Sequence, residues 1–202
     1  MIQIDNILDV EKYINDIDAV IFDLDDTLYS EKEYVRSGYR CIARWLGKTE
    51  VEEQLWNSFQ RGGKAIDEVL EGKDHSEALH IYRNQQPAIH LYSGVGEMIE
   101  RIRKQMKVGI ITDGRPEGQR AKIKALGLQV DKVIVTDELG GVEYRKPNPL
   151  AFVKMQKAFD IPFKKMIYVG DNLSKDFIAP EKLKMKYIYL RNEEGLYYQQ
   201  KV

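Results

Sequence analysis

Acidic side chains gather at the end of a short apolar run near the start of the chain. Residues 19–22 (Ala-Val-Ile-Phe) are followed by Asp23, Leu24, Asp25 and Asp26. Alternate side chains of a strand point to the same face, so we expect Asp23 and Asp25 to project together. Two carboxylates held this close repel each other unless a cation or a proton compensates them. The stretch therefore indicates a cation site, with an ordinary acidic turn or a helix start as the alternative.

Further polar side chains lie where other apolar runs end, or where a helix is expected to start. Two of these runs cover residues 107–112 and 165–169, and the helix starts near residue 149. In a parallel sheet the carboxyl ends of the strands share one edge, where ligands bind, so these side chains should meet the first acidic stretch there. The candidate site residues added in this way are Thr112, Asp113, Lys146, Asp171, Asn172 and Asp176.

Together these side chains would suit a hard cation beside an anion. Such a cation takes oxygen ligands, and carboxylates and hydroxyls supply them. Thr112 and Lys146 are available to hold an anion in the same crevice. A divalent metal next to an anion and a carboxylate nucleophile is the arrangement that phosphoryl transfer requires. Phosphoryl transfer is therefore the chemistry that these residue types favour.

The segments that must position these residues change in character along the chain. Residues 30–89 are rich in Glu and Lys, have apolar residues at helical spacing and contain no convincing strand pattern. The segment after them alternates apolar runs with helical patterns, which is typical of a parallel sheet covered on both faces. We therefore predict an α/β fold with a helical insertion after the first strand.

Individual elements follow from the same patterns. Residues 4–17 have apolar side chains at helical spacing and predict a short leading helix. The predicted strands cover residues 19–23, 107–112, 132–136, 165–169 and 186–190. The predicted helices after the insertion cover residues 94–106, 118–126, 149–159 and 174–183.

The motifs of a known superfamily, haloacid dehalogenase (HAD), resemble four stretches of this chain in the same order: Asp23-Leu-Asp-Asp-Thr27, Thr112, Lys146-Pro147, and Gly170-Asp171 with Asp176. The resemblance covers residues 19–177, and each motif lies at the end of an expected strand or the start of an expected helix. It implies a Rossmann-like parallel sheet with a small α-helical cap domain. Residues 1–29 and 90–202 would form the core domain, and residues 30–89 the cap, which opens and closes over the crevice.

The resemblance also implies chemical roles for single residues. Asp23 matches the nucleophile that attacks phosphorus and forms an aspartyl-phosphate, and Asp25 matches the general acid/base. Thr112 and Lys146 match the residues that hold the phosphoryl group, and we place Asp113, which follows Thr112, in the same phosphate-binding group. Positioning and charge neutralisation would supply most of the rate, because a carboxylate is a weak nucleophile.

By the same resemblance the cofactor is Mg²⁺. Asp171 matches a magnesium ligand, together with Asp23 and the backbone carbonyl of Asp25. Asp176 matches a supporting acidic residue, and we place Asn172 in the same supporting group. Mg²⁺ takes one or two protein carboxylates, a phosphate and several waters, which agrees with this set of ligands.

The function that the resemblance implies is Mg²⁺-dependent hydrolysis of a phosphomonoester, with a small phosphorylated metabolite as substrate. Dehalogenases of the superfamily lack an acid/base at the position of Asp25, because halide leaves without a proton. The presence of Asp25 therefore argues for phosphate chemistry and against dehalogenation. A phosphomutase of the same superfamily would use identical catalytic residues and stays open as an alternative. A phospho-accepting, receiver-like module and a binding protein without catalysis are further alternatives.

The composition argues against several classes of partner. The 202 residues include 31 Lys and Arg against 32 Asp and Glu, and this net charge of −1 gives no reason to expect nucleic acid or an anionic membrane as a partner. The single cysteine, Cys41, excludes an internal disulfide and agrees with a reducing cytoplasm. The first residues lack the pattern of a signal peptide, and no apolar run approaches the roughly 18 residues of a membrane span. We expect a cytoplasmic monomer or homodimer with a small phosphorylated substrate.

Three further features have open interpretations. Arg115 lies three residues after Thr112, where it could approach an anionic group of a substrate or remain solvated. Residues 193–198 predict a surface turn with aromatic packing. Asp26 receives no chemical role from the motifs.

Overall fold

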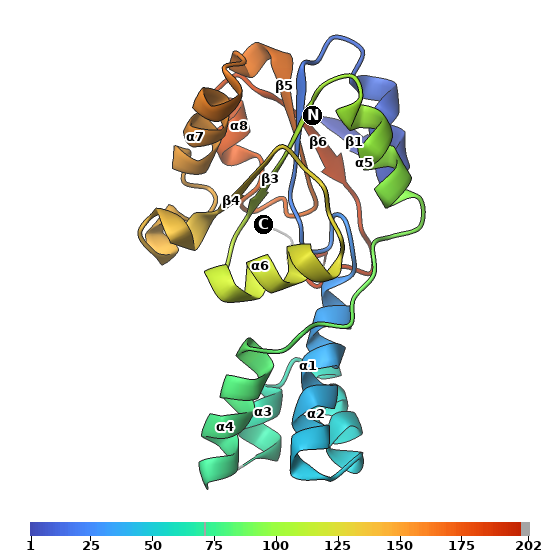
Figure 1. The fold of residues 1–202 in the computed structure, drawn as a ribbon, viewed down its shortest axis with the longest axis vertical. Coiled ribbons are helices and arrows are strands. Elements are labelled where there is room, and N and C mark those ends of the chain that lie inside the picture. The colour runs from blue at the N-terminus through green and yellow to red at the C-terminus, as the bar shows by residue number, and fades with distance from the viewer. Residues whose placement is uncertain (71, 199–202) are drawn as a thin grey trace.

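Six parallel strands form one sheet in the computed structural model, which describes residues 1–70 and 72–198 (Figure 1). Their order across the sheet is β1-β6-β5-β2-β3-β4. Every neighbouring pair runs parallel, as the alternation of strands and helices predicts. The strands are β1 (Ile2–Ile4), β2 (Ala19–Phe22), β3 (Lys107–Thr112), β4 (Lys132–Val135), β5 (Met166–Gly170) and β6 (Lys186–Leu190).

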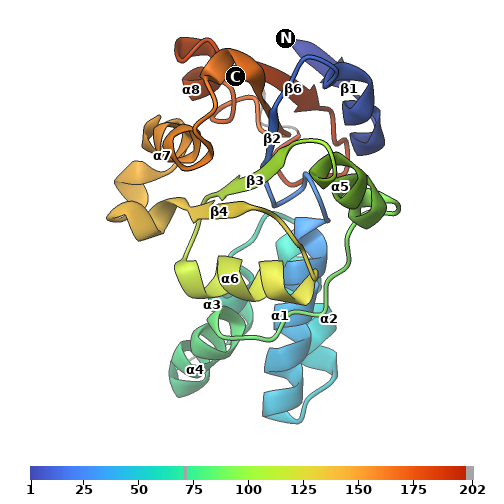
Figure 2. The ribbon, with the colours of Figure 1, turned by 45° about the horizontal axis from the view of Figure 1, so that its top comes forward.

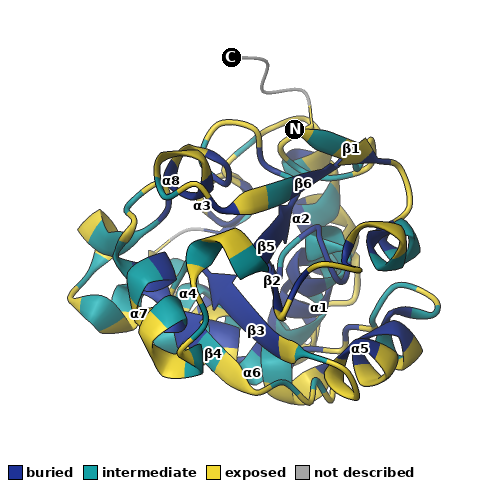
Figure 3. Cartoon of the chain, turned by 90° about the horizontal axis from the view of Figure 1, so that it is seen from above, coloured by how far each residue is buried: buried dark blue, intermediate teal, exposed yellow. Residues whose placement is uncertain are grey.

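Strand β2 lies in the interior of the sheet, and its side chains are apolar on both faces. It pairs with β5 on one side and β3 on the other, and all four of its residues are buried (Figure 3). Phe22, its last residue, is in register with Ile110 of β3 and Val169 of β5. The three strands therefore end close to one level, which brings the residues that follow them to one edge of the sheet.

Helices cover both faces of the sheet (Figure 1). Val20 and Phe22 of β2 pack into the cluster that contains residues of η1 and α5, whereas Ala19 and Ile21 pack into the cluster that contains residues of α7 and α8. This alternation is expected of a strand that is buried on both faces. The elements around the sheet are η1 (Ile7–Tyr13), α5 (Val95–Arg103), α6 (Pro116–Ala125), η2 (Thr136–Leu139), η3 (Val142–Tyr144), α7 (Leu150–Phe159), η4 (Phe163–Lys165) and α8 (Ile178–Lys182), where η denotes a 3₁₀ helix.

Four more helices form a separate group beyond the carboxyl end of β2 (Figures 1 and 2). Their apolar side chains, among them Tyr39, Ile42 and Leu55, form a cluster distinct from the two clusters of the sheet. Helix α6 lies between the sheet and this group in both views. The predicted insertion is thus helical and packs on itself. Its helices are α1 (Glu31–Leu46), α2 (Glu50–Gln60), α3 (Ala65–Val69) and α4 (Gly72–Arg83).

The prediction of a leading helix over residues 4–17 is right only for the middle of that range, where the helix is a 3₁₀ helix. Residues Ile2–Ile4 form the edge strand β1, which pairs with β6, and a 3₁₀ helix follows over Ile7–Tyr13. The Asn6 side chain accepts a hydrogen bond from Leu8 N at 3.0 Å and so caps that helix. A strand of three residues is too short for alternation to be recognised, and the 3₁₀ helix also brings every third or fourth residue to one face.

The predicted helix over residues 174–183 forms over only half of that range. Only Ile178–Lys182 is helical, and residues 173–177 form turns. The Asp176 carboxylate accepts a hydrogen bond from Asn172 N at 3.0 Å, which closes a turn instead of starting a helix. This turn carries part of the candidate site.

No helix in the part of the chain that the structure describes combines the length and the apolar character needed to cross a membrane.

Candidate active site

Lys146 lies at the centre of a buried cluster of carboxylates. Its Nζ lies 2.7 Å from Asp23 Oδ1 and 2.8 Å from Asp176 Oδ1. It also donates a hydrogen bond to the Tyr168 hydroxyl at 2.9 Å. Asp23 directly follows β2, and its backbone N donates to Val169 O at 2.8 Å, so the sheet itself positions it. The structure thus brings together three polar residues that the sequence places far apart.

The charges in this cluster determine its protonation. Burial raises the pKa of Asp23 to about 7, although the Lys146 charge acts in the opposite direction. Burial and the neighbouring charge of Asp176 also raise the pKa of Asp171 well above its ordinary value. Burial favours the neutral form of Lys146, but Asp176 and Asp23 outweigh that effect and raise its pKa. Lys146 therefore stays positively charged, and its single charge is not enough to balance the carboxylates around it.

The three carboxylates form a group that fits a hard divalent cation. Asp23, Asp171 and Asp176 each offer one oxygen, and these oxygens lie within 4.8 Å of one another. A methyl group at Gly170 would clash with the Asp176 carboxylate. Glycine at this position therefore allows the Asp176 carboxylate to lie close to the end of β5. Carboxylate oxygens are the donors that Mg²⁺ prefers, and a divalent charge would compensate the excess negative charge around Lys146. The residues therefore fit Mg²⁺.

Asp25 faces a different set of partners. Lys122 Nζ lies 2.7 Å from its Oδ1, and Gln119 Nε2 donates to its Oδ2 at 2.8 Å. The Tyr29 hydroxyl donates a further hydrogen bond to Oδ1. Burial acts to raise the pKa of Asp25, but the Lys122 charge and the hydrogen bonds outweigh it and lower that pKa. Asp25 is therefore held as a carboxylate, separately from the cluster around Lys146.

Lys122 and Gln119 are two further candidate site residues, which the sequence pattern does not reveal. They lie three residues apart on α6 and so share one face of that helix. Both are buried, and Lys122 Nζ lies 4.3 Å from the centroid of the Tyr34 ring in α1. Sequence alone does not distinguish a buried lysine from the many solvated lysines of amphipathic helices. The signal that could have found Lys122 is its one-turn separation from Gln119, on a helix that directly follows a motif.

Thr112 and Asp113 end strand β3 in contact with both groups of residues. Thr112 is fully buried, and its hydroxyl accepts a hydrogen bond from Gln119 Nε2 at 3.0 Å. The Asp113 carboxylate accepts hydrogen bonds from Lys146 N at 3.0 Å and from Lys175 Nζ at 2.9 Å. Burial acts to raise the pKa of Asp113, but Lys146 and Lys175 lower it. Asp113 therefore orients Lys146 through its backbone, and a direct role of Asp113 in phosphate binding stays a prediction.

Hydrogen bonds connect the supporting residues with one another and with the first motif. Thr27 Oγ1 donates to Asp171 Oδ1 at 3.3 Å, which links the first motif to the last. The Asn172 side chain accepts hydrogen bonds from the backbone N and the hydroxyl of Ser174. These contacts stabilise the loop after β5 that carries Asp171.

Asp26 has a structural role that the motifs do not reveal. Its φ of 52° is in the left-handed region, which aspartate tolerates better than most residues. Its carboxylate accepts hydrogen bonds from Glu31 N at 2.8 Å and from Leu196 N at 2.7 Å. The predicted surface turn of residues 193–198 is therefore attached to the loop after β2, and Tyr197 lines the cavity. Asp26 joins that segment to the start of α1.

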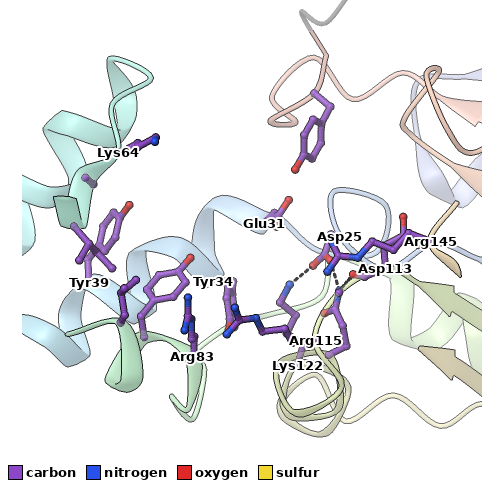
Figure 4. A pocket seen from close by; sticks show the side chains of 18 of the residues that line it. Asp25, Glu31, Tyr34, Tyr39, Lys64, Arg83, Asp113, Arg115, Lys122 and Arg145 are labelled. Atoms are coloured by element: carbon purple, nitrogen blue, oxygen red, sulfur yellow. Dashed lines mark hydrogen bonds and ion pairs between the residues drawn. The ribbon is translucent and has the colours of Figure 1, made fainter. Parts of the chain in front are cut away.

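A cavity of about 610 Å³ connects these groups to the helical insertion (Figure 4). Its core side includes Asp23, Asp25 and Asp171. Its other side includes residues of α1, α3 and α4, among them Tyr34 and Arg83. The candidate nucleophile, the candidate acid/base and the insertion therefore face one cavity that is open to solvent and of a size that suits a small ligand.

The chain is similar over most of its length to known proteins. A family model described as haloacid dehalogenase-like hydrolase matches residues 17–183. A glyceraldehyde 3-phosphate phosphatase from Pyrococcus abyssi is 33% identical over 199 residues, which cover 87% of this chain and 82% of that protein. A pyrophosphatase from Halalkalibacterium halodurans is 26% identical and covers 78% of this chain and 76% of its own length. The crystal structure of a HAD-superfamily hydrolase from Geobacter sulfurreducens superposes with a TM-score of 0.66 at 18% identity, covering 86% of this chain and 87% of the other.

These matches agree with the motifs, the parallel sheet and the helical insertion. The family model alone covers more than half of the chain. The chain therefore belongs to the haloacid dehalogenase-like hydrolases, and its relatives place it among the phosphatases of that family.

Proposed function

We propose that this protein hydrolyses phosphomonoesters of small metabolites with the help of Mg²⁺, through an aspartyl-phosphate formed on Asp23. The observation that carries the proposal is the buried contact of Lys146 with both Asp23 and Asp176, beside Asp171. Asp23 and Asp171 line the same cavity as Asp25. Such a cluster offers a nucleophile, a positive charge and oxygen ligands within a few ångströms.

In the first step a carboxylate oxygen of Asp23 attacks phosphorus as the bond from phosphorus to the ester oxygen breaks. Asp25 gives its proton to the leaving oxygen, so that an alcohol departs. Lys146 and the Thr112 hydroxyl, both buried, orient the transferring phosphoryl group. Mg²⁺ held by Asp23, Asp171 and the backbone carbonyl of Asp25, with Asp176 in support, would neutralise charge on that group.

In the second step Asp25 removes a proton from water, and the water oxygen attacks phosphorus. The bond from phosphorus to Asp23 then breaks, which releases inorganic phosphate and restores both carboxyl groups. The pairing of Asp25 with Lys122 favours the carboxylate, the form that this step requires. The first step requires a proton on Asp25, so this pairing must loosen while substrate is bound.

We further propose that residues 30–89 act as a cap and the remaining residues as the core. The separate apolar cluster of α1–α4 supports this division, as does the cavity between these helices and the sheet. Closure of such a cap would exclude water from the aspartyl-phosphate until the leaving group departs. The single cysteine, Cys41, is unpaired, which agrees with action in the reducing cytoplasm. We also propose that the protein is a monomer or homodimer and that its substrate is a small phosphorylated molecule.

Phosphate release from a panel of phosphorylated metabolites, with Mg²⁺ present, tests the proposal. Asp23→Asn should lower kcat by at least about three orders of magnitude, because it removes the nucleophile. Asp16→Asn, an exposed aspartate outside the site, is the matched control and should retain full activity. Activity retained by Asp23→Asn would refute the mechanism. Isomerised phosphorylated product, without steady phosphate release, would establish the phosphomutase instead.

A further inference from the structure

We propose that the cavity also binds a second anionic group of the substrate, through Arg83 of the insertion and Arg115 of the core. The substrate class is then a phosphomonoester whose leaving group has a carboxylate or a second phosphate on a short carbon chain. This inference rests on the proposed phosphomonoester hydrolysis and specifies its leaving group.

The charges that line the cavity are distributed unevenly. Three acidic residues on the core side have cationic neighbours: Asp23 contacts Lys146, Asp25 contacts Lys122, and Asp113 contacts Lys175. Asp171 and Glu31 also line the cavity, and in the described part of the chain neither has a cationic partner within 4.0 Å. Glu31 lies on the same side as Asp25 in Figure 4. The core end of the cavity therefore keeps excess negative charge.

The cations that remain lie elsewhere in the cavity. Lys64, Arg83 and Arg115 all line it, and none has an acidic partner within 4.0 Å among residues 1–70 and 72–198. By contrast Arg145, which also lines the cavity, is paired with Asp137 at 2.7 Å. Arg83 and Arg115 are exposed, and two unpaired guanidinium groups that line one cavity attract an anion more strongly than either group alone.

Arg83 and Arg115 come from opposite sides of the cavity. Arg83 is the last residue of α4 in the insertion, and Arg115 directly precedes α6 in the core. Figure 4 shows Tyr34 in the same region, between the insertion and Asp25. An anion bound by both arginines would therefore join the two parts of the molecule around one ligand. Arginine suits this task because its planar guanidinium binds carboxylate or phosphate with two parallel hydrogen bonds.

Tyr34, Tyr39 and Tyr82 form an aromatic wall of the cavity. This wall would contact the middle of the leaving group, between its ester oxygen and its second anionic group. Tyr34 is buried and packs edge-to-face on Tyr82, with ring centroids 5.7 Å apart. Tyr39 lines the cavity beside them. A short carbon chain can pass along this wall from the ester oxygen near Asp25 to the arginines. The acidic core end repels an anionic leaving group and the arginines attract it, so the substrate is bound in a single direction.

Matched three-carbon esters test the proposal directly. We would compare kcat/KM for glycerol 3-phosphate, whose leaving group is neutral, with that for 3-phosphoglycerate and for propane-1,3-diol bisphosphate. We expect a preference of about 10- to 100-fold for an anionic ester, as charge-assisted hydrogen bonds provide. The two anionic esters distinguish carboxylate from phosphate as the preferred second group. Equal rates for all three esters would overturn the inference and leave the hydrolysis intact.

Variants of the two arginines locate the effect. Arg83→Ala and Arg115→Ala should each reduce the ratio of kcat/KM for the preferred anionic ester to that for glycerol 3-phosphate, mainly through KM. Arg120→Ala is the matched control, because Arg120 lies on α6 but pairs with Glu138 at 2.8 Å on the protein surface, outside the cavity. A ratio that neither arginine variant changes would overturn the proposal.

Binding measurements separate this inference from the proposed function. If no ester releases phosphate, the proposed function fails, and calorimetric titration of the same three esters still tests the arginine site. Tighter binding of an anionic ester, weakened by Arg83→Ala or Arg115→Ala, would support that site. Equal binding of all three esters would overturn it.

Discussion

Lys122 Nζ lies 2.7 Å from Asp25 Oδ1, and this buried ion pair joins helix α6 to the loop after β2. The same ammonium group lies 4.3 Å from the centroid of the Tyr34 ring in α1. One side chain thus contacts both the proposed acid/base and the first helix of the insertion. A movement of α1 over the cavity would change the surroundings of Asp25 directly.

Lys122→Met preserves most of the side-chain length and removes the charge. We expect kcat on alkyl phosphates to fall by about 10- to 100-fold, because Asp25 loses a partner that orients it. The loss should be smaller with p-nitrophenyl phosphate, whose leaving group needs little protonation. Steady-state kinetics on the two esters measure this difference.

The matched control for that variant is Lys124→Met, on the exposed part of the same helix. Loss of one partner of a buried ion pair costs about 3–5 kcal/mol, so urea unfolding must show that Lys122→Met remains folded in the assay. Equal losses on the two esters would contradict a positioning role for Lys122.

Removal of divalent cations should abolish phosphate release, and added Mg²⁺ should restore it. Because Asp23, Asp171 and Asp176 bring three carboxylates together, Mg²⁺ should also raise the Tm. Asp171→Asn should reduce that rise in Tm. Calorimetric scans with EDTA and with MgCl₂ measure the effect independently of activity, and a Tm that does not depend on Mg²⁺ would contradict the site.

The stability of the protein in EDTA should fall as the pH rises from about 4 to about 7. The pKa of Asp23 is raised from 3.8 to about 7 in the folded chain, so the folded state binds more protons than the unfolded state in this window. The stabilising proton is present at low pH and is lost as the pH approaches 7. The Tm measured in EDTA across this pH range shows whether stability falls, as we expect, or rises with pH.

Mg²⁺ should counteract this loss of stability. Once Asp23 has lost its proton, a bound cation would balance its negative charge. The increase in Tm on addition of Mg²⁺ should therefore be larger at pH 7.5 than at pH 5. Asp23→Asn removes the titrating group and should flatten the dependence. A dependence that Asp23→Asn does not change would assign the effect to other groups.

Gly170→Ala should weaken the metal site without removing a ligand. The added methyl group clashes with the Asp176 carboxylate, which must then move away from Asp23 and Lys146. We expect the Mg²⁺ concentration for half-maximal activity to rise by about tenfold, within the range seen when the support of a metal ligand is disturbed. Gly118→Ala, where a methyl group meets only the Tyr34 hydroxyl at 3.6 Å, is the control.

The sequence by itself determined the α/β class, the parallel sheet and the helical insertion. Apolar runs of four to six residues separated by helical patterns are local signals, and each reports on one element at a time. The motif residues that the structure clusters at the sheet edge, including Asp23, Thr112, Lys146 and Asp171, were predictable for the same reason. In a parallel sheet the carboxyl ends of the strands lie at one edge, whatever the details of packing.

Only the tertiary structure decided which charges face one another. Lys122 resembles any helical lysine until α6 is packed against Asp25 and Tyr34, and Asp26 resembles a turn residue until Leu196 donates to it. The edge strand β1 likewise forms only because β6, more than 180 residues later, offers it a partner. Contacts between distant segments depend on how the whole chain packs. The residues that make such contacts therefore show no periodic pattern in the sequence by which they could be predicted.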